Sequence, residues 1–275
     1  MMPTSVQLNR KSVWELAVAL FMLSLVVTPA VAVSAGSVSI LNPKGSGRGI
    51  LMGTSSNWSG YAIAGQNHSV TDVKGTWIVP AIVGTCPTKN STSSSFWVGM
   101  DGLTSGTVEQ MGTTAACVNG APAYSAWIEY YPIPRKSLTK ITVSPGDVMS
   151  VELKYNGTAL VFSMSDLTAK EAYTSSVPGI LAMRSSAEWV AEDPSNLKGP
   201  LPLANFGVVS FGGGSGATSS ADMATVSGVT GSIGAFGSSV VRIQMINSAG
   251  ALKASPSLLS PSGSGFSVSW VSAGP

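Results

Sequence analysis

Two side chains far apart in this sequence, a glutamine and a glutamate, are suited to acid–base chemistry. Gln110 lies just beyond a Trp-Val-Gly-Met-Asp-Gly segment at residues 97–102, and Glu188 begins an apolar, aromatic stretch. A carboxylate is a useful general base near its own pKa, about 4.3 for free Glu. The glutamine amide does not titrate, so its NH₂ can donate to a developing oxyanion while its carbonyl oxygen holds a water. Together they form a workable dyad for hydrolysis in acid.

The composition argues against several other kinds of catalytic site. The chain has one histidine, His68, which sits in a polar, turn-like segment and is predicted to be a solvated loop residue. A Ser-His-Asp triad would have to use it. A zinc site usually takes three or four His, Cys or carboxylate ligands at tight spacing, and the sequence holds no such cluster. We therefore expect no metal and no cofactor.

Charge is sparse and nearly balanced. Charged residues make up 10% of the chain and the formal net charge is +2. A nucleic-acid or anionic-membrane partner would need a basic patch, and no Lys/Arg run supplies one. Acid unfolding comes largely from protonating carboxylates that are paired in the native state. A chain with few carboxylates has less stability to lose as the pH falls, which suits an acidic milieu.

The first 32 residues have the features of a secretory signal peptide. Arg10 and Lys11 form a basic start, residues 16–27 are mostly apolar, and a small-x-small cleavage site ends at Ala32. The alternative is an uncleaved anchor, since the wider stretch of residues 13–35 could span a bilayer if Glu15 were tolerated. In either case we expect the body of the protein outside the cytoplasm. The first interpretation predicts a secreted, extracellular protein without stable membrane association after cleavage.

Export to an oxidising compartment would favour a disulfide between the two cysteines, Cys86 and Cys117. Two cysteines in an exported protein are more often bridged than free. A bond between them would be worth roughly 3–4 kcal/mol in the chain-entropy model. Two buried thiols are the alternative.

The hydrophobic pattern predicts one all-β domain over residues 55–275. Residues 33–54 are rich in glycine and serine and are interpreted as a linker or short pro-segment. Beyond them, apolar residues alternate with polar ones in short runs separated by Gly, Pro, Asn and Ser, which is typical of an antiparallel sandwich or barrel. Asn156-Gly157 is a strong hairpin signal.

Five short segments in a fixed order carry a resemblance to a known family. They lie at residues 56–61, 75–80, 96–112, 124–132 and 186–193. Together they resemble the glutamic peptidases, also called eqolisins or peptidase family G1, with a pattern closer to the prokaryotic branch. The resemblance implies a sandwich of two large antiparallel sheets, like a lectin-type jelly roll, with a cleft on the concave sheet. It also implies protein or peptide substrates, and we expect a monomer.

The resemblance assigns a role to each matching residue. Glu188 would be the general base for the attacking water and then the acid for the leaving nitrogen, and Gln110 would stabilise the oxyanion. Trp97 would lie on the cleft floor, with core packing as the alternative. Asp101 and Glu129 match acidic positions near the cleft that could orient the dyad. Glu192 is interpreted as a charge at a strand end.

Two other functions remain open from the sequence. One is a carbohydrate-acting sandwich such as a retaining glycosidase, whose paired carboxylates lie about 5 Å apart. Glu129 and Glu188 could be that pair, although no strand carries the acidic cluster that such enzymes often show. The other is a noncatalytic lectin-like module.

Overall fold

The structure is a computed structural model that describes residues 38–41, 49–196, 199–213 and 222–274. The predicted signal peptide, residues 1–32, lies outside them. In the described part of the chain no helix is long and apolar enough to cross a membrane. The helical elements there are two 3₁₀ segments, η1 (Gly179–Leu181) and η2 (Ile233–Ser239).

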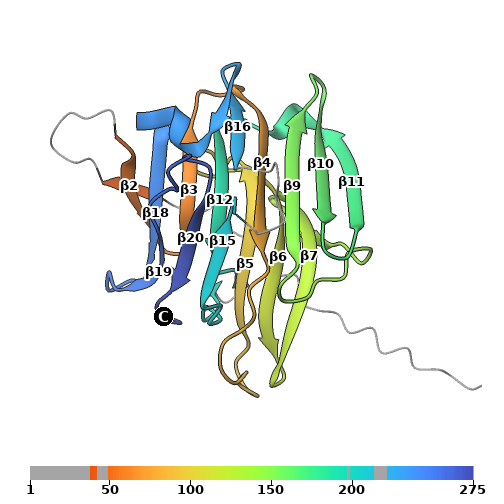
Figure 1. Ribbon diagram of the computed structural model, residues 1–275, viewed down its shortest axis with the longest axis vertical. Coiled ribbons are helices and arrows are strands. Elements are labelled where there is room, and N and C mark those ends of the chain that lie inside the picture. The colour runs from red at the N-terminus through yellow and green to blue at the C-terminus, as the bar shows by residue number, and fades with distance from the viewer. Residues whose placement is uncertain (1–37, 42–48, 197–198, 214–221, 275) are drawn as a thin grey trace, which may run out of the picture.

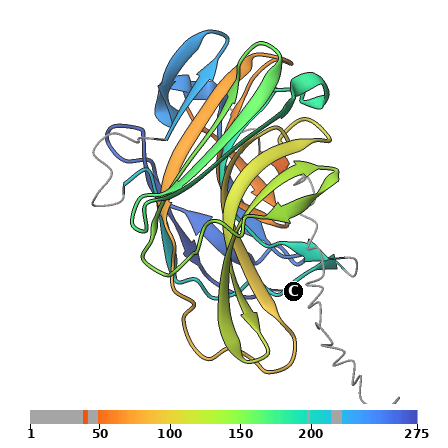
Figure 2. The same ribbon diagram turned by 90° about the vertical axis from the view of Figure 1, so that its right-hand side faces the viewer.

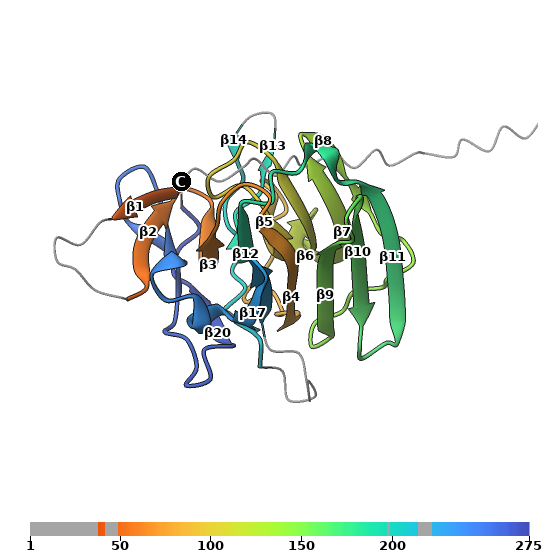
Figure 3. The ribbon, with the colours of Figure 1, turned by 90° about the horizontal axis from the view of Figure 1, so that it is seen from above.

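Two large β-sheets face each other and form the body of the molecule (Figures 1 and 3). The first, called sheet I, has the spatial order β8–β7–β6–β5–β12–β3–β18–β2–β1. Its neighbours are antiparallel except for the parallel pair β2–β18. The strands of sheet I, in chain order, are β1 (Val38–Leu41), β2 (Leu51–Ser55), β3 (Trp58–Ala64), β5 (Thr92–Met100), β6 (Val108–Val118), β7 (Ala121–Tyr131), β8 (Ile133–Ser137), β12 (Ser186–Glu192) and β18 (Val240–Ile246).

The second sheet, sheet II, has the order β11–β10–β9–β4, after which β4 pairs with both β16 and β15. Strand β16 continues to β17, and β15 continues through β20 to β19, which pairs with β18 and so joins the two sheets. Its strands are β4 (Val70–Ile78), β9 (Val148–Tyr155), β10 (Ala159–Asp166), β11 (Glu171–Pro178), β15 (Val208–Phe211), β16 (Met223–Val226), β17 (Val229–Ser232), β19 (Leu252–Pro256) and β20 (Phe266–Trp270). A separate small pair is formed by β13 (Ser195–Asn196) and β14 (Gly199–Pro200).

The predicted hairpin at Asn156-Gly157 is confirmed and shows how the local sequence sets the register. The Asn156 side-chain oxygen accepts hydrogen bonds from the backbone N–H groups of Thr158 and Ala159. Gly157 has a φ of 102°, a left-handed conformation that favours glycine. On the two flanking strands alternate residues are buried between the sheets, namely Met149, Val151, Leu153, Leu160, Phe162 and Met164. The expected two-sheet antiparallel sandwich is therefore confirmed.

The range expected to be a linker contributes two strands to sheet I. Strand β2 runs parallel to β18, with Leu51 opposite Val241, and β1 pairs with β2. Val38 and Leu51 pack against the apolar cluster on the outer face of sheet I. Glycine and serine dominate this range in composition, but its few apolar residues are enough to extend a sheet edge. Whether residues 33–54 are removed as a pro-segment stays a prediction.

The predicted disulfide between Cys86 and Cys117 is confirmed. It ties the loop that follows β4 to the end of β6, where the β6–β7 hairpin projects beyond the rest of the sheets (Figure 2). The bond therefore anchors the far end of the strand that also carries Gln110.

Candidate active site

Three of the predicted site residues lie in one row across sheet I. In register, Glu188 on β12 is opposite Gly99 on β5, Gly99 is opposite Gln110 on β6, and Gln110 is opposite Glu129 on β7. Directly paired residues point to the same face of a sheet, here the face turned away from sheet II. We call these four residues the dyad row.

Gly99 is the residue of the dyad row that has no side chain, and its neighbours close around it. A Cβ at Gly99 would lie 2.9 Å from the Gln110 Cβ, 3.0 Å from the Trp97 ring and 2.8 Å from the Glu109 carbonyl oxygen. Those contacts leave no room for a side chain. Since neighbouring strands are about 4.8 Å apart, Glu188 and Gln110 project from backbones roughly 10 Å apart, with Gly99 and the edge of the Trp97 ring between them.

Glu129 fixes the orientation of the Gln110 amide. The Gln110 Nε2 donates to the Glu129 Oε2 at 3.0 Å. Both residues are buried, and the Gln110 Oε1 has no hydrogen-bond partner within the described ranges. An amide nitrogen has two hydrogens, so one N–H and the carbonyl oxygen of Gln110 remain for a ligand.

Glu188 is a buried carboxyl without a firm partner. Neither of its oxygens has a hydrogen-bond partner of normal geometry among the described residues. Burial raises the pKa of Glu188 well above its ordinary value of 4.5, and the Asp101 and Glu109 carboxyls raise it further. The nearby Ser186 hydroxyl lowers the pKa in part. Such a perturbed group is a candidate for proton transfer.

Asp101 clamps the chain that leads into β12. Its side chain accepts hydrogen bonds from the backbone N–H of Arg184 at 2.6 Å, the backbone N–H of Ser185 at 2.8 Å and the Ser185 hydroxyl at 2.8 Å. Asp101 itself has a φ of 72° and is completely buried. In this position it holds the start of β12, and with it Glu188, against the end of β5. A substrate contact of Asp101 stays a prediction.

Trp97 packs in the row next to the dyad row and is held by Glu192. The Trp97 Nε1 donates to the Glu192 Oε2 at 2.6 Å, and its ring meets Trp58 edge to face with centroids 5.0 Å apart. Trp97 is fully buried, which agrees with core packing, and its place on the cleft floor stays a prediction.

Glu192 differs from the expected strand-end charge. It is fully buried, accepts a second hydrogen bond from the Asn57 Nδ2 at 3.1 Å, and burial raises its pKa well above 4.5. The alternation of side chains along a strand could have predicted the position of Glu192. It lies four positions after Glu188 and therefore points to the same face.

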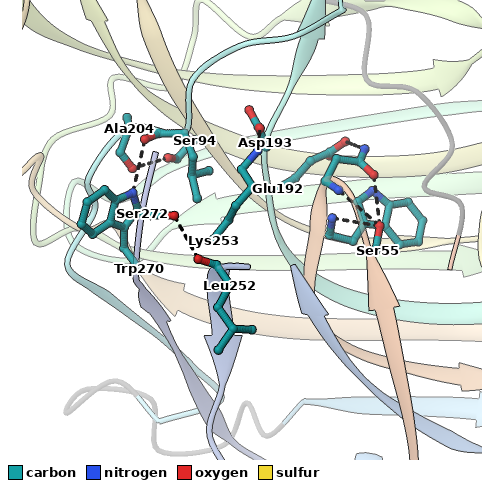
Figure 4. A network of polar contacts seen from close by, with 12 residues as sticks. Ser55, Ser94, Glu192, Asp193, Ala204, Leu252, Lys253, Trp270 and Ser272 are labelled. Carbon is teal, nitrogen blue, oxygen red and sulfur yellow. Dashed lines mark hydrogen bonds and ion pairs between the residues drawn. The ribbon is translucent and has the colours of Figure 1, made fainter. Parts of the chain in front are cut away.

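The next residue, Asp193, forms a buried ion pair with Lys253 of β19 (Figure 4). Burial raises the pKa of Asp193 to about 6, although Lys253 acts to lower it. In the same view Ser55 and its neighbours form hydrogen bonds beside Glu192. The end of β12 is therefore fixed by polar contacts on both sides.

Glu109 is a further buried carboxyl, and the sequence analysis did not select it as a site residue. It precedes Gln110 and is opposite Met100, so it points to the inner face of sheet I. Burial raises its pKa to about 9, with Asp101 as the next largest cause. Glu109 is therefore uncharged throughout the acidic range.

His68 is exposed in a turn with a φ of 66°, as expected of a loop residue. Within the ranges that the structure covers, no group of three or more His, Cys, Asp or Glu residues could hold a metal ion.

Comparison with known proteins bears on this arrangement. The sequence profile of the Peptidase A4 family matches residues 56–255, which include the whole dyad row. The chain belongs to the peptidase A4 family. This confirms the resemblance to the eqolisins, or glutamic peptidases.

Two curated relatives of the family match part of the chain. It is 31% identical to aspergillopepsin-2 of Aspergillus niger over 179 residues, which is 57% of this chain and 62% of that protein. It is 29% identical to scytalidopepsin B of Scytalidium lignicola over 143 residues, 50% of this chain and 52% of that protein. The chain thus spans less than two thirds of the length of either relative. Both relatives are fungal, so the expected leaning toward the prokaryotic branch is not supported.

Solved structures of the peptidase A4 family show the same fold. Scytalido-glutamic peptidase with a transition state analog inhibitor superposes with a TM-score of 0.63 at 25% identity, covering 78% of this chain and 98% of that one. SCP-B, a member of the eqolisin family solved with the tripeptide Ala-Ile-His, gives a TM-score of 0.61 at 24% identity, with 78% and 98% covered.

Proposed function

We propose that this chain is a secreted glutamic endopeptidase that hydrolyses peptide bonds in acidic surroundings with Glu188 and Gln110. The observation that carries the proposal is the dyad row, in which a buried carboxyl, without a hydrogen-bond partner among the described residues, and an oriented amide project from either side of Gly99. Family membership supports the same chemistry.

In the proposed mechanism ionised Glu188 takes a proton from a water as that water attacks the peptide carbonyl carbon. The free N–H of Gln110 donates to the carbonyl oxygen as it becomes negative. Glu188 then gives its proton to the amide nitrogen, the C–N bond breaks, and the products are an acid and an amine. Glu129 keeps the amide turned for this role because it accepts the other N–H.

The carboxyls around the dyad favour acidic conditions. Glu109 and Glu192, with raised pKa values, are uncharged in acid. If they ionised, their negative charges would oppose the developing oxyanion. We therefore expect activity to rise as Glu188 ionises and to fall at higher pH, where its neighbours ionise in turn.

The retaining-glycosidase hypothesis fits the register less well. Glu129 and Glu188 are three strands apart in the dyad row, about 14 Å between backbones, and the Gln110 side chain lies between them. Retaining glycosidases need carboxyls about 5 Å apart. A lectin-like module would have no use for a buried carboxyl without a partner, because such a group costs stability.

The test is casein digestion between pH 2 and pH 7, with an inhibitor of each protease class and with two variants. Glu188→Gln removes the titrating group, and Gln110→Glu replaces the donor with a carboxyl. Each should lower kcat at least about 10²-fold with a smaller change in KM. The double variant should be little worse than the worse single one, as expected for residues acting as a unit. A folded Glu188→Gln protein that still digests casein at near wild-type rate would refute the proposal.

A further inference from the structure

A half-buried arginine from β8 lies over the face of sheet I that carries the dyad row. Strand β8 pairs with β7 at the edge of the sheet. The Arg135 guanidinium carbon is 5.5 Å from the centroid of the Trp127 ring, and its Nη1 donates to the Thr114 Oγ1 at 3.2 Å. Trp127 lies in the row next to the dyad row, and Thr114 in the row after that.

One side of this guanidinium is anchored. Thr114 Oγ1 also accepts from the Trp127 Nε1 at 2.9 Å and contacts the Ser95 hydroxyl at 2.8 Å, so it is held from three directions. In the described part of the chain the bond to Thr114 is the one hydrogen bond that Arg135 donates. A guanidinium has five N–H donors in a fixed fork that matches a carboxylate. Most of these N–H donors therefore have no hydrogen-bond partner among the described residues, and stacking on Trp127 fixes the plane of the guanidinium.

The Glu129 and Glu192 carboxyls near Arg135 compete with an incoming anion, and acid weakens that competition at Glu192. Burial lowers the pKa of Arg135, but Arg stays protonated in proteins, and the nearby Glu129 and Glu192 carboxyls act in the opposite direction. Glu192 is uncharged in acid because burial raises its pKa. The neighbouring Lys136 is opposite Ile128, whose side chain faces the inner core, so Lys136 does not belong to this face.

The Trp97 and Trp127 side chains fill the face beside Arg135. Gly112, between Trp97 and Trp127 in the adjacent row, has no room for a side chain, since a Cβ there would lie 2.6 Å from the Trp97 Cβ and 2.7 Å from the Trp127 ring. Adjacent rows on one face are about 7 Å apart along a strand, and an extended peptide advances about 3.3 Å per residue.

We propose, on the basis of the peptidase function above, that Arg135 binds a carboxylate of the peptide substrate within a few residues of the scissile bond. The carboxylate can come from an acidic side chain or from the C-terminus of a short peptide. Arg135 is then a specificity-determining residue of the site.

The experiment compares peptides that differ by one isosteric change. One arm places Glu or Gln at each of the three positions on either side of the cleaved bond, and the other arm has a free or an amidated C-terminus. The proteins are wild type, Arg135→Gln, Arg135→Lys and the matched control Lys136→Gln from the same strand. Hydrogen bonds in which one partner is ionised are among the stronger ones in proteins. For this half-open site we expect about a tenfold higher kcat/KM for the acidic member of the pair at pH 5.

That preference should grow as the pH rises through about 4.3, where a Glu side chain ionises. It should vanish in Arg135→Gln, weaken in Arg135→Lys because the fork is lost, and persist in Lys136→Gln. Equal rates for every acid and amide pair in a wild-type enzyme that cleaves them would overturn the inference alone. So would an Arg135→Gln variant that slows both members of a pair equally. A wild type that cleaves no peptide faster than Glu188→Gln would instead overturn the proposed function.

Discussion

Glu188 and Glu192 lie on one strand, point to the same face and are both fully buried, yet their surroundings differ. Glu192 accepts hydrogen bonds from the Trp97 indole and the Asn57 amide. Glu188 has no such partner in the part of the chain that the structure covers. A buried carboxyl normally requires hydrogen bonds, so Glu192 has the features of a structural group. Glu188 has those of a group whose partner is a reactant.

The largest effect expected from this comparison is on kcat. Glu188→Gln removes the base and should lower kcat at least about 10²-fold. Glu192→Gln keeps an oxygen that can accept from the Trp97 indole, so kcat should stay within about tenfold of wild type. Steady-state kinetics on one peptide, with circular dichroism to show that both variants are folded, measures the contrast. Equal losses of kcat in the two variants would mean that both carboxyls take part in the chemistry.

Two other buried carboxyls, those of Glu109 and Asp193, predict how the free energy of unfolding depends on pH. Burial raises the pKa of Glu109 from 4.5 to about 9 and that of Asp193 from 3.8 to about 6. A carboxyl with a raised folded-state pKa contributes stability that is complete below its unfolded pKa and is lost as the pH rises through the folded value. The free energy of unfolding should therefore fall between about pH 4 and pH 9, opposite to ordinary acid denaturation.

Urea denaturation across this range tests that sign. A group that is protonated in the folded state and ionised in the unfolded state changes the free energy of unfolding by at most about 1.4 kcal/mol per pH unit. Because the effective dielectric of real protein sites reduces such effects, we expect a total fall of about 2 kcal/mol between pH 5 and pH 8. Glu109→Gln should flatten the curve. A wild type that becomes more stable from pH 5 to pH 8 would contradict the assignment of buried, protonated carboxyls.

A smaller effect should follow from taking away one partner of Glu192. Trp97→Phe keeps an aromatic ring but removes the N–H that donates to Glu192. Leaving a buried acceptor unsatisfied costs about 1–3 kcal/mol. The cost should be larger at pH 7 than at pH 4 because the ionised carboxyl needs the bond more. Trp270→Phe is the matched control: it loses a bond to the Leu203 carbonyl, which does not titrate, so its cost should not depend on pH. Equal pH dependence in the two variants would show that the Trp97 bond does not serve the Glu192 charge.

The sequence predicted the parts of this molecule that local pattern determines. Alternation on β9 and β10 and the Asn156-Gly157 turn between them gave a hairpin whose buried residues are those expected. Gln110 and Glu188 were assigned by the family's motifs, and the register then placed them in one row with Glu129.

The rest depends on which strands become neighbours. Strand β12 inserts between β3 and β5, so Glu192 meets Asn57 across 135 positions of sequence, and no local pattern reveals that contact. Arg135 acquires its place only because β8 folds back beside β7. Residues 38–41 and 51–55 join sheet I through β18, near the other end of the chain. In each case the sequence shows which chemical group the residue carries but not which residue it contacts.

The smallest expected effect concerns the Ser186 hydroxyl close to Glu188. Ser186 lies two positions earlier on the same face of β12 and lowers the pKa of Glu188 in part. Ser186→Ala removes this hydroxyl and should therefore raise the pKa of Glu188 further. Because a general base acts in its ionised form, the acid limb of the kcat/KM profile should move to higher pH, by less than about one unit for a single weak neutral donor. Ser59→Ala is the matched control, since Ser59 is equally buried but is opposite Ala191, on the inner face of sheet I. Its profile should coincide with that of wild type. An acid limb that moves to lower pH in Ser186→Ala, or that moves equally in both variants, would mean that this limb does not report the ionisation of Glu188.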